Sequence, residues 1–197
     1  MYATEQDTPR ISQMRYAFRH LLFSIDPRDL VFVDQSGINL GMARLFARAM
    51  RGKRAVGHKP RNTGQNVTII GALSLDGLIA TMTVNGSADP AVLHTYVTQV
   101  LAPQLWRGAI VVMDNLKVHH ATVIQSAITA VGAQVVFLPP YSPDLSPIEL
   151  CWSKVKQFLR SQAARTYEEL DQAMTQVLSH VTEEDAFGWF AHCGLFI

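Results

Sequence analysis

Cysteine is scarce in this sequence, and long apolar runs are missing. The two cysteines, Cys151 and Cys193, lie far apart and form no CxxC pair. Their placement argues against a zinc ribbon or a disulfide framework and fits a reducing compartment. No apolar run approaches the roughly 20 residues that a helix needs to cross a bilayer. The opening segment, MYATEQDTPR, is polar and carries two acidic residues, so we expect neither a signal peptide nor a membrane partner.

Charged residues are also few, and their distribution says more than their sum. They make up 17% of the 197 residues, against 48% hydrophobic residues, and the formal net charge is only +1. This composition excludes a disordered chain and suits one domain of ordinary size with a substantial core. The near-neutral net charge does not by itself mark a protein that binds nucleic acid.

One stretch of the chain contains no acidic residue. Seven of the 17 Lys and Arg residues lie between Asp34 and Asp76 without an acid among them. We call residues 41–62 the basic insert, and its cationic side chains are Arg44, Arg48, Arg51, Lys53, Arg54, Lys59 and Arg61. Clusters of this kind bind phosphate backbones. A solvated basic loop has the same composition and remains the alternative.

The apolar pattern predicts an α/β fold. The runs LVFVD at 30–34, AIVVMD at 109–114 and AQVVFLPPY at 133–141 predict buried strands. Helical patterns separate these strands, which implies parallel pairing through right-handed crossovers. A turn signal at Leu75-Asp76-Gly77 adds a β-hairpin. We therefore predict a mixed sheet of about five strands with helices on both faces, in a domain that covers residues 30–197.

An N-terminal helix is predicted to precede this domain. Thr8 and Pro9 form a helix start, and apolar residues then recur at helical spacing: Ile11, Met14, Phe18, Leu21 and Ile25. We assign residues 1–29 to this helix and its lead-in, with the apolar stripe packed on its own domain. A seam with a second copy of the chain is the alternative.

Two of the predicted strands finish in aspartate. Asp34 closes LVFVD and Asp114 closes AIVVMD, and an acid at the end of an apolar run is costly to bury unless it is paired or binds a metal. Sites in open α/β sheets form just beyond the carboxyl ends of the strands. We therefore expect both aspartates at one edge of the sheet, although turn chemistry alone would also explain either residue.

Glu149 is the third candidate carboxylate. The segment SPIE at 146–149 has the pattern of a capping box, with Ser146 as the helix cap and Glu149 in the first turn. In one interpretation Glu149 only bonds back to the Ser146 amide. In the other, one carboxylate oxygen caps the helix while the second faces a metal ion.

The helix that follows Glu149 carries basic residues. Lys156 and Arg160 share its face, where they suit a helix lying against phosphates. Trp152 and Phe158 are assigned to the core rather than to base stacking.

Three carboxylates suit hard, oxygen-preferring ions. Magnesium takes few carboxylates together with waters and substrate phosphate oxygens, and two such ions can support an in-line displacement at phosphorus. Zinc is disfavoured, because His119 and His120 are adjacent rather than spaced to share a helix face.

Three strings resemble the catalytic domain of insertion-sequence transposases of the mariner superfamily, which are DDE transposases. They are VFVDQSGINLGMARLFARAMRGKRA, AIVVMDNLKVHH and VVFLPPYSPDLSPIELCWSKVK. The resemblance covers most of the chain, and FLPPYSPDLSPIELCWSKVK is its most specific element. The spacing between Asp114 and Glu149, with positions 115–148 between them, also matches that superfamily.

The resemblance implies an RNase H-like fold and a metal-dependent polynucleotidyl transferase. Its catalytic and metal-binding carboxylates carry over onto Asp34, Asp114 and Glu149, with two Mg²⁺ ions as cofactors and Mn²⁺ as a substitute. Asn115 and His119 are candidates for contact with the substrate. The implied reaction is cleavage of DNA strands at element ends, followed by attack of the freed 3′-hydroxyl on target DNA. The implied partners are double-stranded DNA and either a second copy of the chain or a separate DNA-binding subunit, at the nucleoid in the cytoplasm.

Two departures from the family pattern bear on these expectations. Ser146 stands where the family commonly has Asn, and both are good N-caps. Only about 29 residues precede the first strand, too few for helix-turn-helix modules. We therefore expect a catalytic half, either the second reading frame of a two-frame element or a truncated copy.

Two rival functions stay open. The first is a catalytically silent remnant that binds DNA or dimerises and so modulates a full-length transposase. The second is a cellular RNase H-like nuclease, which the string PPYSPDLSPIE disfavours.

Overall fold

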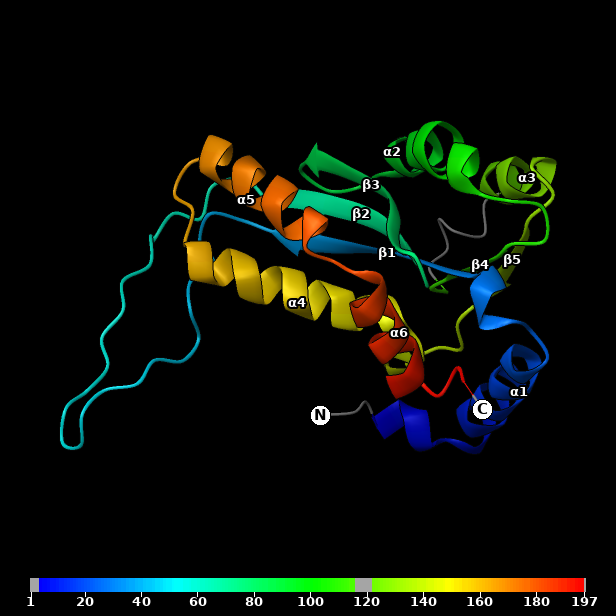
Figure 1. Ribbon diagram of the computed structural model, residues 1–197, viewed down its shortest axis with the longest axis horizontal. Coiled ribbons are helices and arrows are strands. Elements are labelled where there is room, and N and C mark those ends of the chain that lie inside the picture. The colour runs from blue at the N-terminus through cyan, green and yellow to red at the C-terminus, as the bar shows by residue number, and fades with distance from the viewer. Residues whose placement is uncertain (1–3, 116–121, 197) are drawn as a thin grey trace.

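A five-stranded mixed sheet forms the centre of the molecule (Figure 1). The computed structural model describes residues 4–115 and 122–196. The strands are β1 (Leu30–Ile38), β2 (Val67–Ser74), β3 (Gly77–Asn85), β4 (Ile110–Met113) and β5 (Gln134–Phe137). They lie in the order β3-β2-β1-β4-β5. The first three strands pair antiparallel, whereas β1, β4 and β5 pair in parallel, so the predicted mixed sheet is confirmed.

Local sequence explains the strands that matter for the site. The residues 30–33 of β1 and 110–113 of β4 are buried throughout, as strands covered on both faces require. The hairpin of β2 and β3 turns at Leu75-Asp76, and Gly77 follows with a φ of 96°. Glycine adopts that conformation without steric cost, which confirms the hairpin predicted at this point.

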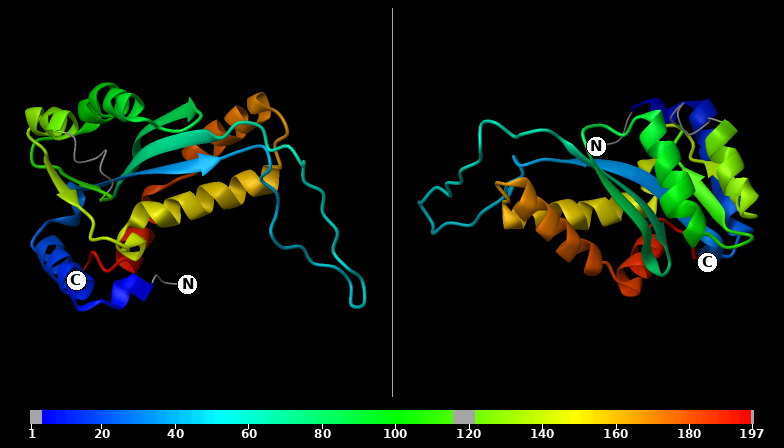
Figure 2. Two further views of the ribbon diagram at one scale, coloured as in Figure 1. Left: turned by 180° about the vertical axis from the view of Figure 1, so that it is seen from behind. Right: turned by 90° about the horizontal axis from the view of Figure 1, so that it is seen from above.

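Helices cover both faces of the sheet (Figure 2), as predicted. One face is packed by α4 (Pro147–Gln162), α5 (Tyr167–Ser179) and α6 (Glu183–His192), with α1 (Pro9–Phe23) at one end. The other face is packed by α2 (Pro90–Thr95), which continues as a π-helical stretch over Tyr96–Leu101, and by α3 (Thr122–Ala130). Short 3-10 turns lie at Thr4–Asp7, Pro27–Asp29, Ala102–Gln104 and Pro143–Leu145.

The described part of the chain contains no helix with the length and apolar character that a membrane span requires.

The N-terminal helix packs on its own domain, but not with the whole predicted stripe. α1 begins at Pro9 after Thr8, as expected. Its buried residues are Ile11, Phe18 and Leu22, whereas Leu21 is 45% exposed. The buried face is therefore set by Phe18 and Leu22, which are four residues apart and lie above one another on a helix.

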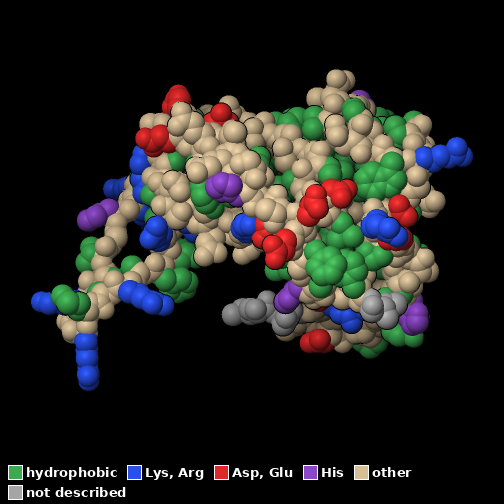
Figure 3. Space-filling model, in the orientation of Figure 1, with side chains coloured by type: hydrophobic (Ala, Val, Ile, Leu, Met, Phe, Trp, Pro, Cys, Tyr) green, Lys and Arg blue, Asp and Glu red, His purple; other side chains and the backbone are tan. Residues whose placement is uncertain are grey.

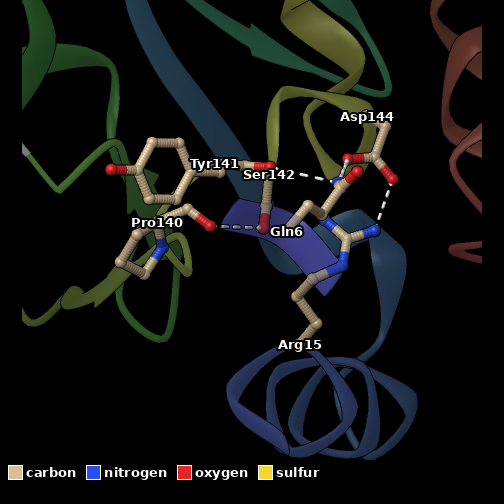
Figure 4. A network of polar contacts seen from close by, with 6 residues as sticks. All are labelled: Gln6, Arg15, Pro140, Tyr141, Ser142 and Asp144. Atoms are coloured by element: carbon tan, nitrogen blue, oxygen red, sulfur yellow. Dashed lines mark hydrogen bonds and ion pairs between the residues drawn. The ribbon is translucent and has the colours of Figure 1, made fainter. Parts of the chain in front are cut away.

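A network of polar contacts joins this N-terminal segment to the loop that leads into α4 (Figure 4). We call residues 138–146 the elbow. Arg15 donates from Nη1 to Asp144 Oδ1 at 2.9 Å and from Nη2 to Oδ2 at 2.6 Å. Gln6 Nε2 donates to the same Oδ1 at 3.0 Å and to the Tyr141 carbonyl oxygen at 3.1 Å. A bidentate pair of this kind fixes orientation as well as position, so the N-terminal segment holds the elbow in place.

The elbow needs such support because its backbone is unusual. Tyr141 has a φ of 55°, in the left-handed region that residues other than glycine rarely occupy. Ser142 Oγ donates to the Pro140 carbonyl oxygen at 3.0 Å within the turn. The Arg15 hydrogen bonds lower the pKa of Asp144 below its usual value of 3.8, which shows that the pair favours the ionised carboxylate.

Replacing Arg15 by Gln should destabilise the protein by about 1–2 kcal/mol near neutral pH, because it removes two charge-assisted hydrogen bonds. Since the pKa of Asp144 is depressed in the folded state, this contribution is present above pH 3.8 and is lost as the pH falls through the folded-state value. Urea unfolding at a series of pH values measures it. Arg28→Gln, which breaks the more exposed pair with Asp26, is the matched control and should cost less. Equal losses for both variants would contradict a special role for the Arg15 pair.

Candidate active site

The register of β1 and β4 places Asp34 beside Asp114. The two strands pair in parallel from Leu30 opposite Ile110 to Val33 opposite Met113. Asp34 and Asp114 directly follow this last pair, Asp34 inside β1 and Asp114 just after β4, and neighbouring strands lie roughly 4.8 Å apart. The expected juxtaposition of these two residues at one edge of the parallel ladder is therefore built into the sheet.

The expectation that β1 ends at Asp34 was wrong. β1 runs on to Ile38, and Asp34 pairs with Gly71 of β2 on its other side. The reason is that β1 keeps its antiparallel partner β2 after β4 has ended at Met113. Asp34 thus lies inside a strand, one residue past Val33, the last residue of β1 with a parallel partner.

Glu149 reaches the same place from the first turn of α4. A cavity of ≈ 490 Å³ is lined by Asp34, Asp114 and Glu149, together with Asn115 and residues of the elbow. The structure therefore brings the three candidate carboxylates to one cavity. Of the two residues expected to contact substrate, Asn115 lies at its wall, and His119 lies outside the described residues.

The capping box predicted at the start of α4 is wrong. Ser146 occupies the N-cap position, but its side chain makes no capping hydrogen bond. Its backbone N–H donates to the Pro143 carbonyl oxygen at 3.0 Å, because the 3-10 turn Pro143–Leu145 runs directly into the helix. The Ser146 amide is therefore already satisfied, and Glu149 lines the cavity instead of capping the helix.

Burial and mutual repulsion shape the electrostatics of the cavity. Burial is the largest cause that raises the pKa of Asp34, to about 6, and the charges of Glu149 and Asp114 add to it. Hydrogen bonds from the Gln35 backbone and the Trp152 indole act in the opposite direction. Burial also raises the pKa of Glu149, where Lys156 opposes the shift and Asp114 adds to it. Repulsion between the carboxylates is present, but burial makes the larger contribution to both pKa shifts.

These carboxylates fit a hard divalent ion. Among the described residues, no group of three or more His, Cys, Asp or Glu side chains is gathered closely enough to hold one ion. Magnesium does not require such a group, since it binds through one or two carboxylates and keeps waters or phosphate oxygens as its other ligands. The partly buried carboxylate of Asp34 and the more exposed carboxylate of Glu149 repel each other, so a cation bound here would relieve unfavourable charge.

Two further groups at the site were not expected to act there. Trp152 is buried in the core, as predicted, but its Nε1 also donates to Asp34 Oδ2 at 3.0 Å. Pro140 and Tyr141 of the elbow form part of the cavity wall. The string PPYSPDLSP signals an elbow, but nothing in the sequence shows which cavity it faces.

The basic insert leaves the body of the protein as a long extended arm (Figure 1). All seven of its cationic side chains are exposed, and basic side chains project from the arm on the face seen in Figure 3. At its base, Arg44 and Lys59 line a hollow of ≈ 480 Å³ together with Lys156 and Arg160 of α4. Four of the predicted DNA-binding residues are thus brought together, whereas five others are spread along the arm: Arg48, Arg51, Lys53, Arg54 and Arg61.

The base of the arm is anchored to the loop between α4 and α5 and to the first residue of α5. Arg165 Nη1 donates to the carbonyl oxygens of Leu40 at 3.0 Å and Met42 at 3.2 Å. The Gln65 backbone N–H donates to the Tyr167 hydroxyl at 2.6 Å. These contacts hold both ends of the insert next to α4, so its direction is fixed at the point where it leaves the sheet.

The raised pKa of Asp34 predicts that this proposed metal ligand destabilises the metal-free protein at high pH. The folded-state pKa of Asp34, about 6, exceeds the usual 3.8, so its contribution to stability is fully present below pH 3.8 and is lost as the pH rises through about 6. At about pH 8, in EDTA, Asp34→Asn should therefore stabilise the protein by about 2–3 kcal/mol. The gain should vanish near pH 4.

Denaturant unfolding measures this difference. Asp76→Asn, at the exposed β2–β3 turn, is the control and should show no gain that depends on pH in this range. A stability difference between Asp34→Asn and wild type that stays constant from about pH 4 to 8 would contradict the assigned pKa.

The arrangement of elements is similar to that of the Mos1 mariner transposase. A Mos1 paired-end complex with the left transposon end gives a TM-score of 0.80 at 16% identity, over 97% of this chain and 61% of that one. A Mos1 paired-end complex with Mn gives 0.79 at 17% identity, over 93% and 59%. The Mos1 catalytic domain gives 0.72 at 15% identity, over 93% and 88%. These likenesses confirm the RNase H-like fold, and the chain spans about three-fifths of the Mos1 chains in the two complexes.

No curated protein sequence matches the chain. A family model does: the one described as DDE superfamily endonuclease matches residues 29–171. That match includes all three carboxylates of the cavity and the whole basic insert. The chain therefore belongs to the DDE superfamily of endonucleases, as its sequence strings indicated.

Proposed function

We propose that this chain is the catalytic domain of a transposase that cleaves DNA strands at element ends and joins them to target DNA. The observation that carries the proposal is the meeting of Asp34, Asp114 and Glu149 at one cavity. The three carboxylates come from β1, from the residue directly after β4 and from α4, so the set depends on the fold rather than on one flexible loop. Membership of the DDE endonuclease family supports the same reaction class.

The carboxylates are proposed to act as ligands for two Mg²⁺ ions, with Mn²⁺ as a substitute. Asp34 and Asp114 would hold the ions, and Glu149 would complete the second site; all three line one cavity. Bound there, the ions would activate the attacking oxygen and neutralise charge on the leaving oxygen. The Mos1 complexes determined with Mg and with Mn support this choice of metals.

DNA is proposed to lie along α4 and the basic insert. Lys156 and Arg160 follow Glu149 on α4 at roughly 10 Å and 16 Å along the helix axis, and they face the same hollow as Arg44 and Lys59. A phosphate backbone that enters the carboxylate cavity would pass these cations next. The exposed cations farther along the arm would extend the contact, and Asn115 is placed to touch the substrate at the cavity wall.

The complete protein is proposed to act with a partner at the nucleoid in the cytoplasm. The proposed partners are double-stranded DNA and either a second copy of the chain or a separate DNA-binding subunit; the similarity to a Mos1 complex with the left transposon end supports DNA as a partner. A silent regulatory remnant is the weaker candidate, because all three carboxylates are present and share one cavity.

Replacing Glu149 by Gln should abolish magnesium-dependent cleavage while leaving the fold intact. Gln keeps the size of the side chain but removes the charge that a metal ligand needs, and α4 loses no capping bond because none is formed. We expect a loss of at least about 100-fold, since even the outer partners of metal ligands are worth 10–100-fold. The assay is cleavage of end-containing DNA, with and without an upstream-frame partner.

The control for this variant is Glu169→Gln. Glu169 closes a real capping box at the start of α5 and lines no part of the carboxylate cavity. It should cleave like the wild type. Normal cleavage by Glu149→Gln would remove Glu149 from the mechanism.

Replacing Arg48, Arg51 and Arg54 by Ala should weaken DNA binding and flatten its salt dependence. Each phosphate contact contributes about 0.9 to the slope of log K against log salt, so the slope should fall by about 2–3. A triple variant at the exposed residues Arg10, Arg19 and Arg107 makes the same change in net charge and should leave the slope near its wild-type value. Equal slopes for the two triple variants would indicate that the insert is a solvated basic loop that does not contact DNA.

A further inference from the structure

The first catalytic carboxylate is held by a tryptophan from another element. Trp152 of α4 is 2% exposed, and its indole Nε1–H donates to Asp34 Oδ2 at 3.0 Å. Trp152 lies three residues after Glu149, so the two side chains project from one face of the same helix. One helix therefore supplies both the third carboxylate and the hydrogen-bond donor for the first.

The sheet leaves a gap for this indole at Gly71. Gly71 of β2 is the direct partner of Asp34, and paired residues of an antiparallel ladder present their side chains to the same face. A Cβ atom at Gly71 would lie 2.7 Å from Trp152 Cη2 and 3.1 Å from Cζ2. On this face of β2, the large side chains of Ile69 and Leu73 lie on either side of Gly71. The Trp152 indole occupies the space that a side chain at Gly71 would fill.

From this geometry we infer that Trp152 is a positioning residue for metal binding, which orients the Asp34 carboxylate through its indole N–H, and that Gly71 provides the space for it. The inference rests on the proposed function of the carboxylate cavity. It adds two residues that are neither metal ligands nor contacts of the substrate.

Rotation of the carboxylate is the property that the bond controls. The terminal torsion of an aspartate side chain is broad, so the sheet alone does not fix which way its oxygens point. The Gln35 backbone also hydrogen-bonds this carboxylate, and the Trp152 indole adds a buried, fixed donor to Oδ2 at 3.0 Å, so the two donors together set the plane of the carboxylate. Outer partners of metal ligands act in this way, and losing one typically weakens metal affinity 10–100-fold.

The test measures Mn²⁺ affinity by electron paramagnetic resonance on the full chain without DNA. Trp152→Phe keeps most of the ring but removes the N–H donor. Gly71→Ala keeps Trp152 but displaces its ring. We expect each variant to bind Mn²⁺ at least 10-fold more weakly than wild type. Because both act through one hydrogen bond, the double variant should bind no more weakly than the weaker single variant.

Each variant has a matched control elsewhere in the chain. Trp106→Phe removes another indole–carboxylate bond, from Trp106 Nε1 to Asp29 Oδ1 at 3.1 Å, which lies before the amino end of β1 and away from the cavity. Gly37→Ala adds a methyl group to β1 at a position where its Cβ meets nothing within 4 Å. Both controls should keep wild-type Mn²⁺ affinity. Circular dichroism and melting in EDTA report whether each variant is folded.

The outcomes separate this inference from the proposed function. If Asp34→Asn loses Mn²⁺ binding while folded Trp152→Phe and Gly71→Ala keep wild-type affinity, the positioning role is overturned and the carboxylate site stands. If Asp34→Asn also keeps wild-type affinity, the metal site itself fails. Should Trp152→Phe not fold, Gly71→Ala decides, because it retains the indole and changes only its position.

Discussion

The parallel pairing of β1 with β4 is the constraint on which the site depends. Its register ends at Val33 and Met113, so the two aspartates that follow are neighbours by construction. Glu149 can join them only because the chain crosses over through α3 and β5 and then returns along the elbow into α4. A shift of that register by one residue would send Asp34 to the opposite face of the sheet, and no movement of a loop could restore the arrangement.

Such a cluster of acids is costly, and the surrounding structure offsets the cost locally. Asp34 is partly buried beside two other carboxylates, and it accepts a hydrogen bond from Trp152 that favours its charged form. The positive charge of Lys156 acts on Glu149. The elbow, whose Tyr141 has a left-handed backbone, is held from outside by Arg15 through Asp144. The fold thus maintains a negative cavity that is unfavourable by itself, as sites prepared for cations commonly are.

The sequence predicts the parts of this molecule that depend on local patterns. Runs such as AIVVMD and the turn at Leu75-Asp76-Gly77 indicate strands and a hairpin without reference to the rest of the chain. The sequence fails where a neighbouring turn or a distant segment supplies the partner of a polar group. The capping box at Ser146 was wrong because a preceding 3-10 turn already uses its amide. The bond from Trp152 to Asp34 joins residues far apart in the chain, so no periodicity could indicate it.

The basic insert leaves and re-enters the sheet at nearly the same point. The Leu40 backbone N–H donates to the Thr63 carbonyl oxygen at 3.1 Å, so a hydrogen bond closes the chain beneath the arm. The entropic cost of closing a loop grows only with the logarithm of its length. The stability of the sheet therefore depends only weakly on the length of the arm. We therefore expect that residues 41–62 can be shortened, lengthened or replaced without moving the strand that carries Asp34.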